Sequence, residues 1–173
     1  MKEERVAIFI DGSNFYHRMM HELGSAKIDF GKFAGLLAGE RSLVRTYYYN
    51  AAVRQEDGKE RYQEQQRFLD ALKYIPYFEV KLGRLEKRGD TVVEKGVDIA
   101  IAVDMVTFAA TDRYDTAIIV TGDGDFAYAV QAVKNLGKHV ENAFFEAGRS
   151  RELLDKADKF ILLDREILKD CLL

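Results

Sequence analysis

Thr116-Ala-Ile-Ile-Val120, followed by Thr121-Gly-Asp-Gly-Asp-Phe126, is the stretch that decides the fold. Its first five residues form a short apolar run, which is typical of a strand buried on both faces of a parallel sheet. The two glycines permit a tight turn, and from Phe126 onward apolar residues recur at helical spacing. The stretch therefore predicts a strand, a turn and a helix. Asp123 and Asp125 fall at the carboxyl end of the strand, where open α/β sheets bind their ligands.

These two carboxylates need an explanation because they lie so close together. Asp123 and Asp125 repel each other unless a cation or a proton offsets their charge. Taken alone, Asp125 has an ordinary explanation as a helix cap, since Asp is a common N-cap residue. That role does not explain Asp123, so we interpret the pair as a candidate ligand site.

A second apolar run repeats the design near the start of the chain. Val6–Ile10 also ends on an acid, in the sequence Asp11-Gly-Ser13-Asn14. Taken alone, Asp-Gly is a common turn pair. Parallel strands place their carboxyl ends at one edge of a sheet, however, so Asp11 and Asp123 are expected to face one crevice. Ser13 or Asn14 is predicted to cap the helix that follows.

A third acidic position opens the apolar stretch from 97 to 110. The alanines of this stretch favour a buried helix over a strand. Asp98 then lies in the first turn, where the helix dipole favours negative charge, and it is expected to point at the same crevice. Asp104 follows six residues later on a different side of the helix. We predict a structural or supporting role for it, because an acid among apolar residues needs a partner.

The remaining segments continue an alternation of strands and helices. Helices are expected over 29–38, 56–75 and 149–157, with a short one from Asp164, and strands over 43–53, 77–82, 137–145 and 160–163. Residues 83–90 are predicted to form a polar loop or hairpin. Strands that alternate with helices indicate an α/β fold with a mainly parallel sheet.

Basic side chains gather around the predicted loop, at Lys81, Arg84, Lys87, Arg88 and Lys95, and the last four are the candidates for binding a substrate. Such a cluster beside carboxylates can steer a phosphate backbone. The acids interspersed among these residues fit a solvated hairpin tip equally well. Tyr49, in a tyrosine-rich strand, is a candidate for stacking on a base, although aromatic residues of strands are more often simply packed.

Composition bounds the class of protein. With 173 residues, 47% hydrophobic and 32% charged, the chain predicts one soluble globular domain over 1–173, with a core of about 6–163. The net charge of -3 argues against a generally basic nucleic-acid coat. Cys171 is the only cysteine, so we expect no intrachain disulfide and a reducing, cytoplasmic setting. No stretch is long enough for a signal segment or a membrane span.

The four aspartates at the predicted crevice, Asp11, Asp98, Asp123 and Asp125, offer hard oxygen ligands without thiolates or paired histidines. That chemistry suits Mg²⁺ or Mn²⁺, which keep several waters and engage substrate phosphates. A divalent ion can lower the pKa of a bound water and offset the charge of a phosphorane. The residues therefore suggest metal-dependent hydrolysis of a phosphodiester.

Three blocks taken together resemble the NYN domain, in the LabA-like group of the PIN-like nuclease superfamily: Ile10–Phe15, Lys95–Asp98 with Asp104, and Thr121–Phe126. The resemblance extends from about Val6 to about Leu163. It implies a Rossmann-like, three-layer α/β/α sandwich and metal-dependent ribonuclease activity on RNA. Carried over by position, it implies metal ligands at Asp11, Asp98 and Asp123, a ligand or water-positioning group at Asp125, and supporting roles for Ser13, Asn14, Asp104 and Thr121.

Two other classes of metal-binding protein fit the same motifs less well. A phosphatase of the haloacid-dehalogenase type needs a second Asp where Ser13 stands, and a von Willebrand A-type metal site needs a Ser where Phe15 stands. The stronger alternative is a non-catalytic RNA-binding or regulatory module on the nuclease fold. Four aspartates argue against it, because an idle cluster of like charges costs stability. A homodimer is a further expectation, since a second subunit can extend the groove of a small nuclease.

Overall fold

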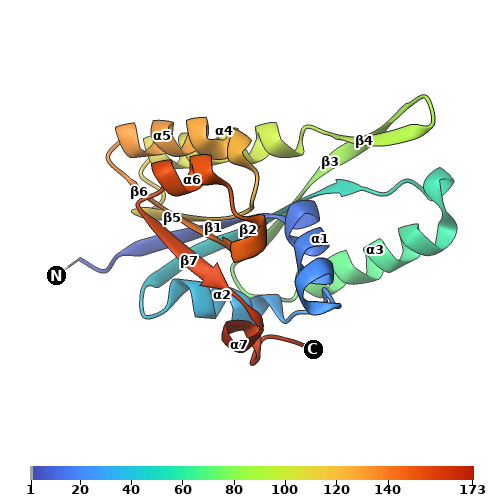
Figure 1. The fold of residues 1–173 in the computed structure, drawn as a ribbon, viewed down its shortest axis with the longest axis horizontal. Coiled ribbons are helices and arrows are strands. Elements are labelled where there is room, and N and C mark those ends of the chain that lie inside the picture. Colours follow the sequence, from blue (N-terminus) through green and yellow to red (C-terminus); the bar gives the residue numbers. More distant parts are fainter. Residues whose placement is uncertain (1) are drawn as a thin grey trace.

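The computed structural model describes residues 2–173 and consists of one sheet with helices on both faces (Figure 1). The strands are β1 (Arg5–Asp11), β2 (Ser42–Ala52), β3 (Phe78–Arg88), β4 (Thr91–Lys95), β5 (Thr116–Val120), β6 (His139–Phe145) and β7 (Lys159–Leu163). The helices are α1 (Gly12–Leu23), α2 (Phe30–Ala38), α3 (Lys59–Leu72), α4 (Val97–Ala110), α5 (Ala127–Asn135), α6 (Arg151–Lys156) and α7 (Arg165–Leu168). Three short 3-10 turns are η1 (Gln55–Asp57), η2 (Gly124–Phe126) and η3 (Glu146–Gly148).

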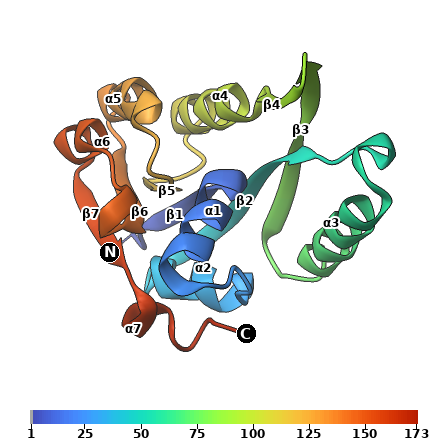
Figure 2. The same cartoon turned by 45° about the vertical axis from the view of Figure 1, so that its right-hand side comes forward.

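The strand order across the seven-stranded sheet is β4-β3-β2-β1-β5-β6-β7. Within the described residues β4 pairs antiparallel with β3, and the other neighbouring strands pair parallel. Figures 1 and 2 show α4, α5 and α6 over one face, and α1, α2, α3 and α7 over the other. The predicted α/β class and the α/β/α sandwich around a mainly parallel sheet are therefore confirmed.

The two faces of the sheet have separate hydrophobic cores, and β1 contributes to both. Ile8 and Ile10 point into the core beneath α1 and α2, while Ala7 and Phe9 point into the core beneath α4 and α5. This alternation follows from the two-residue period of a strand. A strand that is apolar on both sides is thus held at the centre of the sheet.

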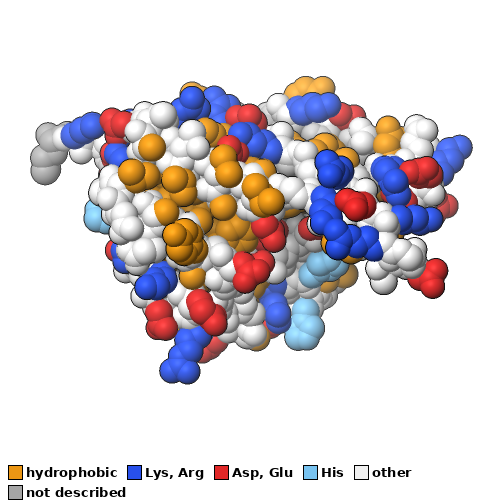
Figure 3. Space-filling model, turned by 90° about the horizontal axis from the view of Figure 1, so that it is seen from above, with side chains coloured by type: hydrophobic (Ala, Val, Ile, Leu, Met, Phe, Trp, Pro, Cys, Tyr) orange, Lys and Arg blue, Asp and Glu red, His pale blue; other side chains and the backbone are white. Residues whose placement is uncertain are grey.

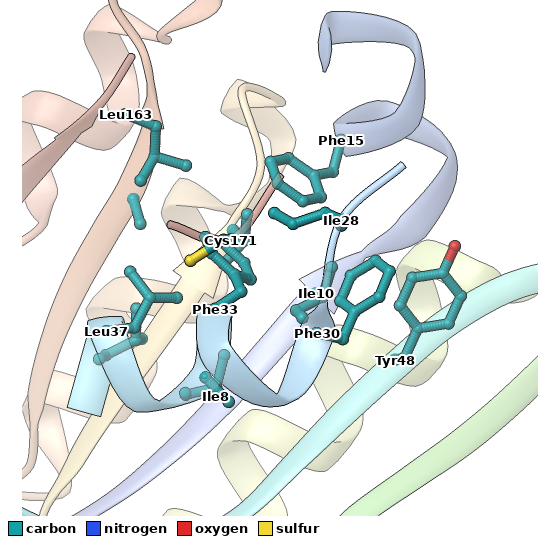
Figure 4. Close-up of a cluster of buried hydrophobic side chains, with 14 of the residues drawn as sticks. Ile8, Ile10, Phe15, Ile28, Phe30, Phe33, Leu37, Tyr48, Leu163 and Cys171 are labelled. Atoms are coloured by element: carbon teal, nitrogen blue, oxygen red, sulfur yellow. The ribbon is translucent and has the colours of Figure 1, made fainter. Parts of the chain in front are cut away.

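Aromatic packing fixes α1 on its face of the sheet (Figure 4). The ring of Phe15 stacks on Phe33 of α2 at 5.1 Å between centroids, and Phe30 meets Tyr48 of β2 edge-on at 5.3 Å. Such pairs add to the free energy gained by burying the rings. Because Phe15 is anchored, the first turn of α1 stays at the carboxyl edge of the sheet.

A second aromatic group fixes α4 on the opposite face. Phe9 of β1 stacks on Tyr47 of β2 at 5.2 Å, and the Tyr47 ring lies 5.1 Å from that of Phe108. Phe108, near the end of α4, therefore ties the helix to both central strands. The first turn of α4, which carries Asp98, is directed to the same edge as the first turn of α1.

The segment predicted as a loop or hairpin is a hairpin, but β3 is longer than the predicted strand. It continues to Arg88 and pairs with Thr91–Lys95 through a turn at Gly89 and Asp90. Sequence reasoning ended the strand at Leu82 because polar residues follow it. They are accommodated because the hairpin projects beyond the sheet, where both of its faces meet solvent (Figure 2).

Helix α3 is shorter than the predicted helix over 56–75. It begins at Lys59, after η1, because Gly58 adopts a φ of 129° that cannot continue a helix. Arg54 holds η1 through a 2.8 Å ion pair to Asp57. The helix ends at Leu72, before Pro76.

Gly122 marks a close approach between the end of β5 and the loop after β6. A Cβ atom at this position would collide with the backbone oxygen of Gly148 and with the ring of Phe144. A Cβ atom added to Gly35, in the exposed middle of α2, would meet nothing within 4 Å beyond the backbone of its own helix. The two glycines therefore offer a matched comparison.

We predict that Gly122→Ala lowers the free energy of unfolding by about 1–3 kcal/mol, as overpacking does. Gly35→Ala should raise it by roughly 0.5–1 kcal/mol, because alanine favours the helix. Urea denaturation of both variants and the wild type measures the difference. Equal stability of the wild type and the Gly122 variant would contradict the close approach.

Candidate functional site

The candidate site lies where the order of strands reverses, between β1 and β5 at the carboxyl edge of the sheet. Asp11 is the last residue of β1, and Thr121 directly follows β5. The two strands are parallel neighbours, with Ile10 opposite Val120. This is the topological switch point at which open α/β sheets bind ligands.

Hydrogen bonds join the ends of these two strands. The hydroxyl oxygen of Thr121 lies 3.1 Å from Asp11 Oδ2 and 3.3 Å from Asn14 Oδ1. The hydroxyl can therefore donate its single proton either to the Asp11 carboxylate or to the Asn14 carboxamide oxygen. The amide of Gly122 donates to Asn14 Oδ1 at 2.9 Å, and the amide of Asp123 donates to the Thr121 hydroxyl at 3.1 Å. The loop after β5 is thereby held against the first turn of α1.

The predicted caps of α1 are not formed. The helix begins at Gly12, so Ser13 and Asn14 lie inside its first turn, and Asp11 occupies the N-cap position without a side-chain capping bond. The side chain of Asn14 faces β5, where it accepts the Gly122 amide. Sequence reasoning missed this because the partner lies 108 residues away.

Asp123 and Asp125 take different roles in the loop after β5. Asp123 Oδ1 accepts the backbone amide of Asp125 at 2.9 Å and caps η2. The cap is therefore Asp123, whereas the alternative weighed from the sequence assigned capping to Asp125. The side chain of Asp125 is exposed beside it.

Asp98 belongs to the same group of carboxylates. The pKa of its side chain is raised first by partial burial and then by the negative charges of Asp123, Glu94 and Asp125. Coulombic effects of this kind require the groups to lie in one neighbourhood. The structure thus brings the first turn of α4 to the ends of β1 and β5, as the sequence predicted.

Asp11 is the most perturbed of these acids. Burial in the sheet, where Asp11 is only 4% exposed, raises the pKa of its carboxyl to about 7. The hydrogen bond from Thr121 acts in the opposite direction, and the charges of Asp98 and Glu94 raise the pKa further. Within the described residues, none of the four predicted ligands, Asp11, Asp98, Asp123 and Asp125, forms an ion pair with a basic side chain.

The donor set fits a hard divalent cation in chemistry, since the side chains at this edge present carboxylate, hydroxyl and carboxamide oxygens. Among residues 2–173 no three acidic, histidine or cysteine side chains are already placed to hold one ion. Mg²⁺ commonly keeps several waters and takes only one or two protein carboxylates. An ion at this site would therefore complete its coordination with water and substrate oxygens.

Glu94 belongs to this neighbourhood, although sequence reasoning treated it as a diluting charge in the hairpin. Its carboxylate raises the pKa of both Asp11 and Asp98. It lies on β4, which leads into α4 through Gly96. The signal available in the sequence was its position only four residues before Asp98, at the end of the strand that leads into α4.

Asn142 is a second residue that sequence reasoning missed. It lies on β6 with no exposed surface, and its Nδ2 donates to the backbone oxygens of Ile119 at 3.2 Å and Thr121 at 2.9 Å. The side chain thereby ties β6 to the end of β5, where the site begins. An asparagine inside an otherwise apolar strand was the available signal.

Tyr49 and Asp104 form a separate contact beneath α4. Asp104 Oδ2 accepts the Tyr49 hydroxyl and the Lys81 ammonium, each at 2.7 Å. These contacts agree with the prediction that Asp104 has a structural role and needs a partner. Tyr49 is 1% exposed, so its ring has no free face for a base, which corrects the stacking prediction.

The four basic residues predicted to bind substrate separate into two pairs on the hairpin. Arg84 and Lys95 are cross-strand partners close to the start of α4, and Lys87 and Arg88 lie near the turn. Arg84, Lys87 and Arg88 are exposed, and Arg88 lies 3.8 Å from Glu86. The Arg84–Lys95 pair therefore lies closer along the hairpin to the first turn of α4 than Lys87 and Arg88 do.

Comparison with known proteins agrees with this geometry. The NYN domain family matches residues 5–164, so the chain belongs to the NYN domain family, which is PIN-like. The low amplitude and bright protein LabA of Synechococcus elongatus is 28% identical over 171 residues, which cover 94% of this chain and 86% of that protein. The crystal structure of VPA0982 from Vibrio parahaemolyticus, a protein of unknown function, is 27% identical, with a TM-score of 0.78 over 95% of this chain and 97% of that one.

Helices of the described residues are all too short or too polar to span a bilayer.

We predict that Asp11→Asn stabilises the metal-free protein above neutral pH. The folded pKa of about 7 exceeds the ordinary value of 3.8, so the wild type loses stability as the pH rises from about 4 through 7. The variant has no ionisable group at this position and does not lose stability in this way. Its free energy of unfolding should therefore exceed that of the wild type by about 2–4 kcal/mol at pH 8. Urea denaturation in EDTA at pH 5 and pH 8 measures the change.

Asp125→Asn is the matched control, because the Asp125 side chain is exposed. The free energy of unfolding of this variant should change with pH as that of the wild type does. If the free energy of unfolding of the wild type and of the Asp11 variant changes with pH in the same way, the pKa of Asp11 is not raised by burial.

Proposed function

We propose that this protein is a metal-dependent ribonuclease that hydrolyses RNA phosphodiester bonds. The observation that carries the proposal is the buried Asp11 carboxylate, which is repelled by Asp98 and Glu94 and has no ion-pair partner among the described residues. Uncompensated negative charge at a sheet edge costs stability, and a bound cation would offset it. Membership of a PIN-like nuclease family supports the same reaction class.

The proposed ligands of Mg²⁺ or Mn²⁺ are Asp11, Asp98 and Asp123, with Asp125 as a ligand or as the group that positions a water. When bound, such an ion lowers the pKa of water and offsets negative charge on phosphate oxygens. Asp125, which is exposed, is free to accept a proton from an attacking water. Asn14 and Thr121 form hydrogen bonds that hold the loop after β5, which carries Asp123 and Asp125.

The remaining residues are proposed to position the strand of RNA. Arg84 and Lys95 share one face of the hairpin near the first turn of α4, where they can contact phosphates. Lys87 and Arg88 extend the positive charge toward the hairpin tip. Phosphate contacts orient a nucleic acid without reading its sequence.

A non-catalytic RNA-binding or regulatory module is the second candidate. It is favoured by one observation: the described residues contain no three side chains already placed to chelate an ion. Under this candidate the acids would bind an ion or a partner without assembling a reactive site. The two candidates differ in whether RNA is cut.

We predict that the protein cuts labelled single-stranded or structured RNA with Mg²⁺ or Mn²⁺, and that EDTA stops the reaction. Asp123→Asn and Asp11→Asn should each lower the rate by roughly 100-fold or more, because each removes a proposed ligand of the ion that activates the attacking water. Asp70→Asn, which changes an exposed acid on α3, is the control and should keep the wild-type rate. The measurement is initial rate on denaturing gels.

Cutting that persists in the Asp123 variant would overturn the site assignment. Metal-dependent binding of RNA without cutting would instead establish the non-catalytic module.

A further inference from the structure

Helix α4 is apolar on the face that it turns away from the sheet. Its inner face, which includes Ile101, Met105 and Phe108, is buried in the core. Ile99 is 70% exposed and Val103 is 55% exposed. Because each residue turns a helix by about 100°, these two positions lie on the side opposite to the buried residues. The helix thus has two apolar faces, and only one of them is covered.

The outer face forms a continuous stripe along α4. Val106 is half-buried and Ala110 is exposed, so positions 99, 103, 106 and 110 follow one another at intervals of four, three and four residues. Residues at this spacing are neighbours on a helix surface. The outward face of a helix in a soluble protein normally carries polar and charged side chains, whereas this stripe has none. Figure 3 shows hydrophobic side chains gathered over α4 and α5. A surface of this kind is typical of an interface with another protein.

The two acids of α4 point away from the stripe. Asp104 accepts hydrogen bonds from Tyr49 and Lys81 beneath the helix. Asp98 lies about 100° from Ile99 around the helix axis, on the side of the acidic centre. A partner can therefore cover the stripe without burying an unpaired carboxylate, which would cost binding free energy.

The two ends of α4 carry opposite charges on one side of the helix. Glu94 is exposed just before α4, and its cross-strand partner Leu85 packs against the core beneath α4. Arg113 is exposed just after α4, with its guanidinium 4.8 Å from the ring centre of Phe108, and it forms no ion pair within residues 2–173. Lys81 of β3 lies over the same ring, so Arg113 and Glu94 both lie on the β3 side of α4.

The stripe complements itself when two copies of α4 run antiparallel. Ile99 of one copy then lies opposite the partner's Ala110, and Val103 lies opposite the partner's Val106. A large side chain meets a small one at both ends of the contact, and two side chains of one size meet at its centre. Such alternation lets facing helices interdigitate. The pairing is the same for both copies, as a two-fold interface requires.

The same register also matches the charged ends. Arg113 lies three residues beyond Ala110, so in the antiparallel pair it comes level with the partner's Gly96 and next to the partner's Glu94. The two-fold axis produces this contact twice. Antiparallel packing also sets the positive N-terminus of each helix beside the negative C-terminus of the other. A second copy of this chain therefore supplies both the apolar surface and the order of charges that the outer face of α4 needs.

We propose that the outer face of α4 is the interface of a two-fold dimer of this chain, in which the α4 helices pack antiparallel and Arg113 of each copy pairs with Glu94 of the other. Because Glu94 belongs to the neighbourhood of Asp98 and Asp11, each copy places a basic group at the border of the other's acidic centre. The dimer does not require that the protein cuts RNA.

The first test is the molecular mass in solution, measured by sedimentation velocity over a range of micromolar concentrations at low salt. The wild type should sediment as a dimer. Val103→Asp should raise the dissociation constant by roughly 100-fold or more, because the interface buries the new charge twice. Leu36→Asp is the matched control, since Leu36 is 43% exposed but lies on α2, over the opposite face of the sheet. Circular dichroism checks that both variants are folded.

The second test exchanges the charges. Glu94→Arg and Arg113→Glu should each weaken the dimer by roughly 10-fold, because each sets two pairs of like charges in the interface. An equimolar mixture of the two variants should dimerise as the wild type does, since every such contact in the mixed dimer again joins opposite charges. A change confined to one chain cannot produce this recovery.

The outcomes that overturn the proposal are distinct from failure of the proposed function. A wild type that is monomeric at every concentration overturns the dimer. A dimer that persists in the Val103 variant and is lost in the Leu36 variant moves the interface to the opposite face of the sheet. A mixture that does not recover overturns the antiparallel pairing. Each result is obtained without RNA, so it holds whether or not the protein is a ribonuclease.

Discussion

The parallel pairing of β1 with β5 is the contact on which the site depends. Val6–Ile10 and Thr116–Val120 lie side by side in the middle of the sheet, and both runs are almost completely buried. Their separation in the chain is about 110 residues, so the pairing has a large cost in loop-closure entropy that hydrophobic burial must offset. Once formed, it places Asp11 beside Thr121 without any further adjustment of the chain.

Rigid packing lets the sheet edge hold carboxylates that repel one another. Aromatic groups on both faces fix α1 and α4, and hydrogen bonds from Asn14 and Asn142 fix the end of β5. Asp11 is buried beside other acids, and burial together with their negative charges raises the pKa of Asp11 and of Asp98, so keeping these groups ionised costs stability. Positions at which local stability is sacrificed are commonly positions of function.

The sequence predicted the frame of this arrangement because its signals are local. Apolar runs that end in Asp11 and Thr121 marked two buried strands, and the alanine-rich stretch after Val97 marked a helix. The limits of β3 were not predictable in this way, since a hairpin exposed on both faces has no hydrophobic period. Tyr49 illustrates the same limit, because composition cannot tell a buried ring in a strand from an exposed one.

The sequence by itself determined the α/β class, the strands that end in acids and the oxygen-rich chemistry at their ends, because each follows from residue type and spacing along a few turns or strands. Only the tertiary structure decided that Glu94 joins the acids and that Asn142 braces the end of β5. Burial, charge coupling and side-chain direction depend on contacts between segments far apart in the chain, and no local pattern encodes them.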